Sequence, residues 1–155
     1  GKATTNKSKW PSHHGHEQSG LPLLEQFCQR LRVPKSFKSL AVLVMNYHTH
    51  SHRCFELKAS TLTDMLGALG AFKISNSTLL DFVLACEADS KGRTGLENKP
   101  YPQANYLIKA AEASRNIDTS AILKGELQGP KIGEAIRRLR ISAVSHYIKG
   151  TLKSV

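Results

Sequence analysis

The sequence predicts an all-α fold in which a helical core is followed by a helical tail. Apolar residues recur at steps of three and four along most of the chain, which is the period of one helix face. No segment alternates apolar and polar residues as a half-buried strand does. Proline and glycine also stand where helices begin and end, since Gly129-Pro130 precedes the last apolar stripe and Gly150 follows it.

The first half of the chain accounts for four of the expected helices. Residues 1–15 are polar and are expected to form an ordered loop. The apolar stripe of the second helix ends at His48, so this imidazole is expected to face the core, before a polar turn over 49–53. The four helices are expected over residues 16–32, 34–48, 60–70 and 78–90. In the last of them the expected core positions are Leu79, Val83 and Cys86, and the flanking positions are Phe82 and Asp89.

The second half begins with a glycine-rich basic loop over 91–95 and a linker that ends at 100–102. A soft boundary between core and tail is therefore expected near 92–102. Three further helices are expected over residues 103–116, 119–124 and 130–149. The apolar stripe of the last helix is expected to consist of Ile132, Ile136, Leu139, Ala143 and Tyr147.

Composition limits the class of protein. The 155 residues suit one domain or two small ones, and no apolar run approaches the ~18 residues that a membrane span needs. The net charge is +10, and the segments 1–38 and 101–155 each carry +5 of it (7 basic minus 2 acidic, and 9 minus 4). This distribution suggests a polyanionic partner, although solubility alone would also explain it. Three cysteines without CxxC spacing argue against a disulfide scaffold and fit a reducing cytoplasm.

Three side chains are candidates for metal ligation. His16 stands at the entrance to the first helix, His48 at the end of an apolar stripe, and Asp89 near the end of the fourth helix. Imidazoles and a carboxylate at the margin of a core need partners, and one divalent metal ion satisfies both types of group. The alternative is that the histidines are hydrogen-bonded core residues and that the aspartate is solvated.

Several motifs carry a family resemblance over nearly the whole chain. They are the runs Trp10-Pro-Ser-His-His-Gly-His-Glu, Leu31-Arg-Val-Pro, Glu87-Ala-Asp-Ser-Lys-Gly-Arg-Thr-Gly, Tyr101-Pro-Gln and Gly133-Glu-Ala-Ile-Arg-Arg-Leu-Arg-Ile. Together they resemble the C-terminal part of bacterial CCA-adding enzymes (tRNA nucleotidyltransferases) of the form that carries an HD-type phosphohydrolase domain. The run from Glu87 to Gly95 is the most specific of them.

The resemblance implies an HD-like helical body over 1–92 and a helical, tRNA-binding tail over 93–155. It places His16, His48 and Asp89 at the last three positions of the HD metal-ligand set. The family's preceding His-Asp doublet is normally followed by Gly-Lys, so the chain is expected to start just after that doublet.

The family's other components follow from the same resemblance. A transition metal such as nickel would serve the HD site on small phosphoesters, including 2′,3′-cyclic phosphates. The nucleotide-adding head, with its magnesium, CTP and ATP, would lie upstream, and the enzyme would be cytoplasmic.

One position departs from the family pattern. The resemblance implies an aspartate directly after His48, where this chain has Thr49. A threonine supplies no carboxylate for a metal or for proton transfer, so the isolated chain is expected to be inactive. His50 and His52 either compensate for the missing group or are surface loop residues, and the second interpretation is favoured.

Cations of the tail and of the glycine-rich loop are the candidates for RNA binding. Along the last helix, a line of basic residues lies about a quarter to a third of a turn from the apolar stripe, with Arg137 on its other side. Such a line can follow the phosphates of an RNA backbone. The candidates are Lys91, Arg93, Lys131, Arg137, Arg138 and Lys149. Tyr101, Tyr106 and Tyr147 could stack on bases, but packing is the favoured role for each.

Three hypotheses therefore remain open. The chain is part of a CCA-adding enzyme with an incomplete metal site, or a complete but non-catalytic helical module that binds RNA, or an HD-class phosphohydrolase with an unrelated substrate. The oligomeric state and the identity of the metal stay open in all three.

Overall fold

The computed structural model describes residues 2–10, 12–75 and 77–152, and every regular element within them is helical. The elements are η1 (Lys2–Thr4), η2 (Lys7–Lys9), α1 (His16–Arg30), α2 (Lys35–His52), η3 (Cys54–Glu56), α3 (Ala59–Ala68), α4 (Ser77–Lys91), α5 (Gln103–Arg115), α6 (Ser120–Lys124) and α7 (Pro130–Leu152). The all-α prediction is confirmed. No helix in the described part is long and apolar enough to cross a membrane. Gly1 and Pro11, which belong to motifs used above, lie outside the described residues.

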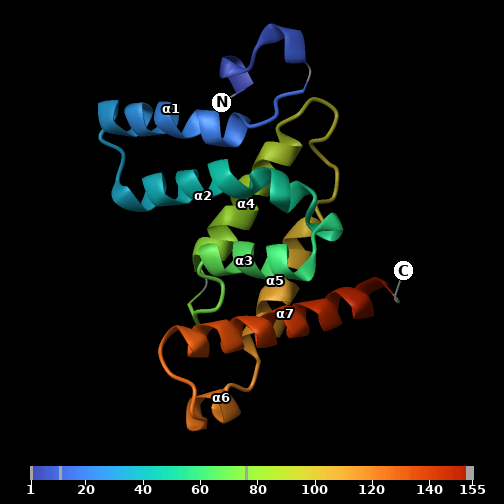
Figure 1. Ribbon diagram of the computed structural model, residues 1–155. Helices are drawn as coiled ribbons and strands as arrows, with labels where there is room; N and C mark the ends of the chain where they lie inside the picture. Colours follow the sequence, from blue (N-terminus) through green and yellow to red (C-terminus); the bar gives the residue numbers. More distant parts are fainter. Residues whose placement is uncertain (1, 11, 76, 153–155) are drawn as a thin grey trace.

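The helices form two packed groups that share α4 (Figure 1). The hairpin of α1 and α2 lies beside η1 at the amino-terminal end of the molecule, and α4 crosses α2. At the other end, the long helix α7 packs on both α3 and α5, and the short helix α6 contacts α7 from outside. The helix α5 also contacts α4, so the chain after the 91–102 loop returns to the same body.

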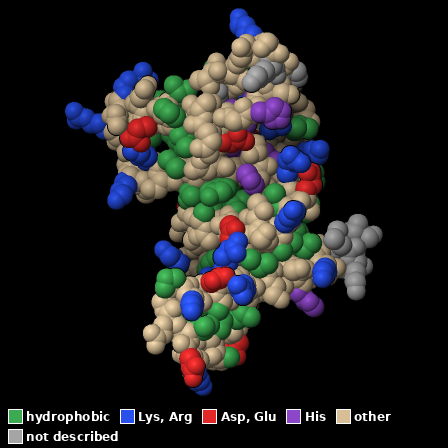
Figure 2. Space-filling view, in the orientation of Figure 1, with side chains coloured by type: hydrophobic (Ala, Val, Ile, Leu, Met, Phe, Trp, Pro, Cys, Tyr) green, Lys and Arg blue, Asp and Glu red, His purple; other side chains and the backbone are tan. Residues whose placement is uncertain are grey.

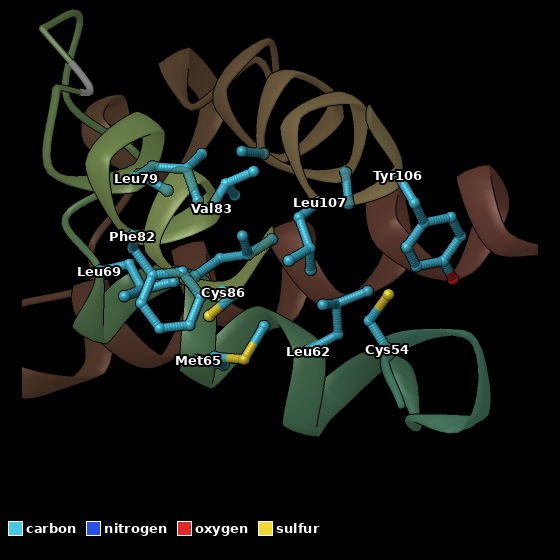
Figure 3. Packing of buried hydrophobic residues seen from close by; sticks show 14 of the residues in the cluster. Cys54, Leu62, Met65, Leu69, Leu79, Phe82, Val83, Cys86, Tyr106 and Leu107 are labelled. Atoms are coloured by element: carbon cyan, nitrogen blue, oxygen red, sulfur yellow. The ribbon is translucent and has the colours of Figure 1, made fainter. Parts of the chain in front are cut away.

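One apolar core lies between α3, α4, α5 and α7 (Figure 3). The α3 segment contributes Leu62, Met65 and Leu69, which are buried, and α5 adds Tyr106 and Leu107. Because α5 and α7 bury side chains in the same cluster as α3 and α4, this core spans both sides of residue 92. The largest of its fully buried apolar side chains are Phe82, Leu62, Met65, Leu66, Leu69, Leu79, Leu107 and Val144.

The residues expected to flank the core of α4 are placed differently by the structure. Phe82 is fully buried, so its flanking assignment is wrong, whereas Asp89 is about half exposed. The reason is that α4 is contacted by both α2 and α5, which bury a wider arc of the helix than a single stripe.

The buried arc of α7 is also rotated from the expected stripe. Val144 is fully buried, while Leu139, an expected stripe residue, is 37 % exposed. The guanidinium of Arg140 lies over the ring of Phe72, 4.0 Å from its centroid. Burial lowers the pKa of Arg140, and the ring face compensates part of that cost. The arc follows the groove between α3 and α5 rather than the most apolar line of the helix.

Two helix ends also differ from expectation. The expected turn over 49–53 is helical as far as His52, because no proline or glycine interrupts α2 there and the side chain of Ser51 is buried. Gly150 does not end the last helix, which continues to Leu152. Its φ is not positive, whereas a glycine that ends a helix usually adopts the left-handed conformation.

Candidate functional site

The imidazoles of His16 and His48 meet across the α1–α2 hairpin. Their Nε2 atoms are 3.1 Å apart. Gly15, with φ +77°, turns the chain into α1 and puts Nδ1 of His16 2.7 Å from the carbonyl oxygen of His13. Within α2, Nδ1 of His48 lies 3.0 Å from the carbonyl oxygen of Val44. The two rings are therefore oriented by backbone groups on their far sides.

This orientation determines which ring nitrogens carry protons. A carbonyl oxygen only accepts hydrogen bonds, so Nδ1 of His16 and Nδ1 of His48 must both be N–H. In the neutral rings both Nε2 atoms then present lone pairs to each other, which is unfavourable at 3.1 Å unless a proton or a cation lies between them. A histidine that binds a metal has the same pattern, with its second nitrogen donating to a carbonyl group.

The separation also suits two ligands of one metal ion. Two nitrogens that are each ~2.1 Å from a metal lie ~3.0 Å apart at a right angle and ~3.4 Å apart at a tetrahedral angle. The Nε2–Nε2 distance of His16 and His48 falls in this range. Their chemistry fits a borderline metal such as zinc, nickel or cobalt.

Asp89 lines the same pocket as the two histidines but does not complete a ligand group with them. Its Oδ2 lies 2.9 Å from Nε2 of His52 and 3.5 Å from a guanidinium nitrogen of Arg93. Among the described residues, no three His, Cys, Asp or Glu side chains are close enough together to hold a metal ion. The structure thus brings His16 and His48 into contact and places Asp89 on the wall beside them.

The pocket has a volume of about 690 Å³ and is mostly apolar away from these groups. Lys2 and Ala3 of η1 reach its edge, so the amino-terminal segment also borders it. A pocket of this size and lining can hold a small organic molecule. The apolar lining from α1, α2 and α4 consists of Leu24, Phe37, Leu40, Ala41, Val44, Met45 and Ala85.

His52 also belongs to the site, although it was not among the three candidate ligands. The favoured interpretation as a surface loop residue is wrong, because His52 belongs to α2 and its side chain is only 20 % exposed. Its Nδ1 lies 3.1 Å from the hydroxyl of Tyr101, which in turn lies 2.9 Å from the hydroxyl of Ser51. The spacing of four residues from His48 was the available signal, since it places both imidazoles on one helix face.

His50 points elsewhere. Its ring packs edge-on against Tyr47, and it lines a separate pocket of about 230 Å³ together with Thr49 and Arg53. Its Nδ1 is buried without a described hydrogen-bond partner. His50 is therefore not a surface loop residue, and it does not line the pocket of His16 and His48.

Thr49 supplies a hydroxyl to a carboxylate that comes from another helix. Its Oγ1 donates to Oε1 of Glu17 at 2.8 Å, and Oε2 of Glu17 lies 3.5 Å from Nδ1 of His16. Burial raises the pKa of Glu17, but hydrogen bonds from its own amide and from Thr49, with the two histidines, lower it overall below its usual value. Glu17 is thus an ionised carboxylate beside the pair, directly after His16 in sequence.

Asp89 is likewise held as a carboxylate. Burial opposes ionisation, yet the hydrogen bond and charge of His52, with the charges of Arg93 and His48, lower the pKa of Asp89 overall. An ionised Asp89 accepts hydrogen bonds and donates none, which sets the direction of its contact with His52.

Most of the candidate RNA-binding cations have acidic partners in the chain. Lys91 pairs with Glu87 at 2.7 Å and Arg93 with Asp89 at 3.5 Å. Lys131 and Lys149 are exposed and form no ion pair with any residue of the described ranges. On the face in Figure 2, basic and acidic side chains are interspersed over the lower half of the molecule.

Arg137 and Arg138 of α7 pair with carboxylates in different places. Arg137 forms a two-pronged pair with Asp64 of α3, with both N–O distances 2.7 Å, so it links two helices of the core. Arg138 pairs with Glu134 one turn earlier on its own helix, at 2.6 Å. The latter pair is exposed and can exchange Glu134 for a phosphate at little cost.

The three tyrosines pack against protein, as the favoured interpretation expected. Tyr101 and Tyr106 are buried, and Tyr147 is partly buried against Tyr106, with ring centroids 5.3 Å apart. Tyr106 also meets Phe55 edge-on at 4.7 Å. None of these ring pairs presents a row of open faces on which successive bases could stack.

The chain is similar in sequence to one portion of longer bacterial proteins described as multifunctional CCA protein. It is 50 % identical over 144 residues to that of Methylococcus capsulatus (93 % of this chain, 34 % of the relative). The identity is 47 % over 144 residues for Teredinibacter turnerae (93 % and 35 %) and 44 % over 147 residues for Pseudomonas fluorescens Pf-5 (95 % and 36 %). The chain therefore spans about a third of the length of the curated relatives it matches.

No family model matches the chain, and no solved structure matches it.

Proposed function

We propose that this chain, a portion of a bacterial multifunctional CCA protein, carries an incomplete HD-type metal site of the kind that hydrolyses phosphoesters, and a tail that binds tRNA. The nucleotide-adding activity, with CTP, ATP and magnesium, then belongs to the two thirds of the relatives that the chain does not match. A cytoplasmic enzyme is the expected setting, since that is where the family matures tRNA.

The observation that carries the metal site is the pair of opposed Nε2 atoms. His16 and His48 are both oriented by carbonyl oxygens so that their lone pairs converge at 3.1 Å, and a divalent transition metal satisfies both at once. Asp89 on the same wall is the third residue that would hold it. When bound, such an ion lowers the pKa of a bound water and polarises a phosphoryl oxygen. The apolar wall of the pocket would orient the organic part of the phosphoester.

Metal binding by the purified chain tests this site. Isothermal titration with Co²⁺ should show about one equivalent bound per chain, and His16→Ala or His48→Ala should each abolish the binding. The matched control is His146→Ala, because His146 is exposed on α7 and lines a different pocket. Binding that survives loss of either imidazole would contradict the site.

The tail supports the RNA-binding part of the proposal through cations that form no ion pair within the part of the chain that the structure describes. Lys131 and Lys149 lie near opposite ends of α7, and Arg138 between them has only an exposed partner within its own helix. A line of cations on a long helix suits contacts to phosphates without reading of bases. Affinity for tRNA should fall steeply as salt is raised, and a salt-independent or absent interaction would count against the tail.

A non-catalytic RNA-binding module is the alternative function. Two observations favour it: no third ligand joins the histidine pair among the described residues, and Thr49 stands where the family pattern implies an aspartate. The titration with Co²⁺ separates the two functions, because a module without a metal site would bind tRNA and leave the ion in solution.

A further inference from the structure

We propose that His52 is a positioning residue, which holds the carboxylate of Asp89 at the wall of the His16–His48 pocket and anchors it to the buried hydroxyls of Tyr101 and Ser51. The inference rests on the proposed metal site and assigns a role to a residue outside its three ligands. It is carried by a continuous series of hydrogen bonds across three segments of the chain.

The carboxylate of Asp89, at one end of this series, determines which group donates in each hydrogen bond. Because a carboxylate oxygen accepts hydrogen bonds, Nε2 of His52 is the donor in the 2.9 Å contact. In the neutral ring Nδ1 of His52 then carries a lone pair, and it accepts a hydrogen bond from the hydroxyl of Tyr101 at 3.1 Å. The oxygen of Tyr101 in turn accepts from Ser51 at 2.9 Å. Every group in the series therefore has a defined role, and the end of the series is buried.

The series of hydrogen bonds holds one carboxylate oxygen of Asp89 and leaves the other oxygen without a side-chain donor among the described residues. Oδ2 receives His52 and, at the longer distance of 3.5 Å, Arg93. Oδ1 accepts no hydrogen bond from a side chain that the structure describes, while the residue itself lines the pocket with His16 and His48. Oδ1 is thus the oxygen left to face a ligand. Carboxylates that bind metals are commonly held through their second oxygen in this manner.

His52 cannot itself be the missing third ligand in this arrangement. Both of its ring nitrogens are engaged, and its tautomer is opposite to that of the pair, with Nε2–H rather than Nδ1–H. Its ring centroid lies 6.0 Å from that of His48, one helical turn earlier, so His48 and His52 share one face of α2. Tyr101 stands two residues before α5, which extends the support of the site into the second half of the chain.

The first test needs no metal. Long-range ¹⁵N NMR correlations of the metal-free chain at pH 8 should show an Nε2–H tautomer for His52 and Nδ1–H tautomers for His16 and His48. Asp89→Asn should alter the signals of His52 and leave those of His146 unchanged. An Nδ1–H tautomer for His52 in the unsubstituted chain would overturn the inference, whatever the metal does.

The second test is a double-mutant cycle read by Co²⁺ affinity and by the visible absorption of the bound ion. His52→Ala should weaken binding about 10- to 100-fold, and it should have no further effect when Asp89 is already Asn. His52→Gln should restore part of the affinity, because its amide can donate to Oδ2. Arg93→Ala is the matched control, since it removes only the weaker contact to the same oxygen.

The outcomes separate the inference from the proposed function. Equal affinity of the unsubstituted chain and the folded His52→Ala variant would overturn the role of His52 and leave the metal site standing. Equal losses from His52→Ala with and without Asp89→Asn would show that His52 acts independently of Asp89, which also overturns it. A folded, unsubstituted chain that binds no Co²⁺ would instead reject the proposed site, and the inference with it.

Discussion

Nε2 of His16 faces Nε2 of His48 at 3.1 Å, although 32 residues separate them in sequence. The contact exists because α1 and α2 form a hairpin in which the first residue of one helix meets the fourth turn of the other. Each ring is fixed from behind by a backbone carbonyl, so the meeting of two lone pairs does not depend on any other side chain. This relationship is the observation on which the proposed metal site rests.

The isolated chain should show little or no phosphodiesterase activity. With 2′,3′-cyclic AMP and added Ni²⁺ we expect hydrolysis at the background rate, because no third ligand joins the histidine pair among the described residues and Thr49 provides no carboxylate. Chromatographic detection of 2′- and 3′-AMP measures it. Metal-stimulated turnover that disappears with His48→Ala would contradict this prediction.

The hydrogen bond from Thr49 to Glu17 should make stability depend on pH. Because the pKa of Glu17 is lowered on folding, its contribution is fully present above the ordinary value of 4.5 and is lost as pH falls through the folded value. Thr49→Val should reduce the free energy of unfolding by about 1 kcal/mol at pH 7 and by much less near pH 3.

Urea denaturation at both pH values measures the effect of Thr49→Val. The matched control is Thr61→Val, an exposed residue of α3, which should change stability little at either pH. The same loss for Thr49→Val at pH 3 and pH 7 would show that the charge of Glu17 is not involved.

Arg137 and Lys149 should separate stability from RNA binding. Arg137→Ala breaks the link between α7 and α3 and should lower the melting temperature by about 2–4 °C or less, as expected for an exposed pair. Lys149→Ala should leave the melting temperature unchanged and reduce the slope of log affinity for tRNA against log salt by about one phosphate. A smaller salt slope for Arg137→Ala, with an unchanged slope for Lys149→Ala, would show that Arg137 faces the RNA.

Truncation of Phe82 should test the position of the core. Phe82→Ala removes a fully buried ring between the helices and should cost about 3–5 kcal/mol of unfolding free energy. Leu84→Ala, two residues later on the exposed side of α4, should cost less than about 0.5 kcal/mol. Chemical denaturation followed by circular dichroism compares them, and similar losses for the two variants would refute the observed orientation of α4.

The helical class and the positions of most helices could be predicted from the sequence. Both depend on the local periodicity of apolar residues and on the prolines and glycines at helix ends. The helix α3 shows this most clearly: Leu62, Met65, Leu66 and Leu69 follow each other at helical spacing in the sequence, and all four are buried. The spacing also placed His48 on the apolar face of α2, where it lines the pocket, although the helix continues four residues further to His52. The resemblance to CCA-adding enzymes, which rests on short motifs, is matched by the similarity to the multifunctional CCA proteins.

Tertiary packing decided which arc of each helix is buried and which distant side chains meet. Phe82 and Val144 lie inside because α4 packs against both α2 and α5, and α7 against both α3 and α5. The crossing of those helices is not encoded in the period of one segment. The contact of His52 with Asp89 joins residues 37 positions apart. A hydrogen bond of this kind depends on how α2 and α4 cross, so the period predicts the helices but not the bond between them.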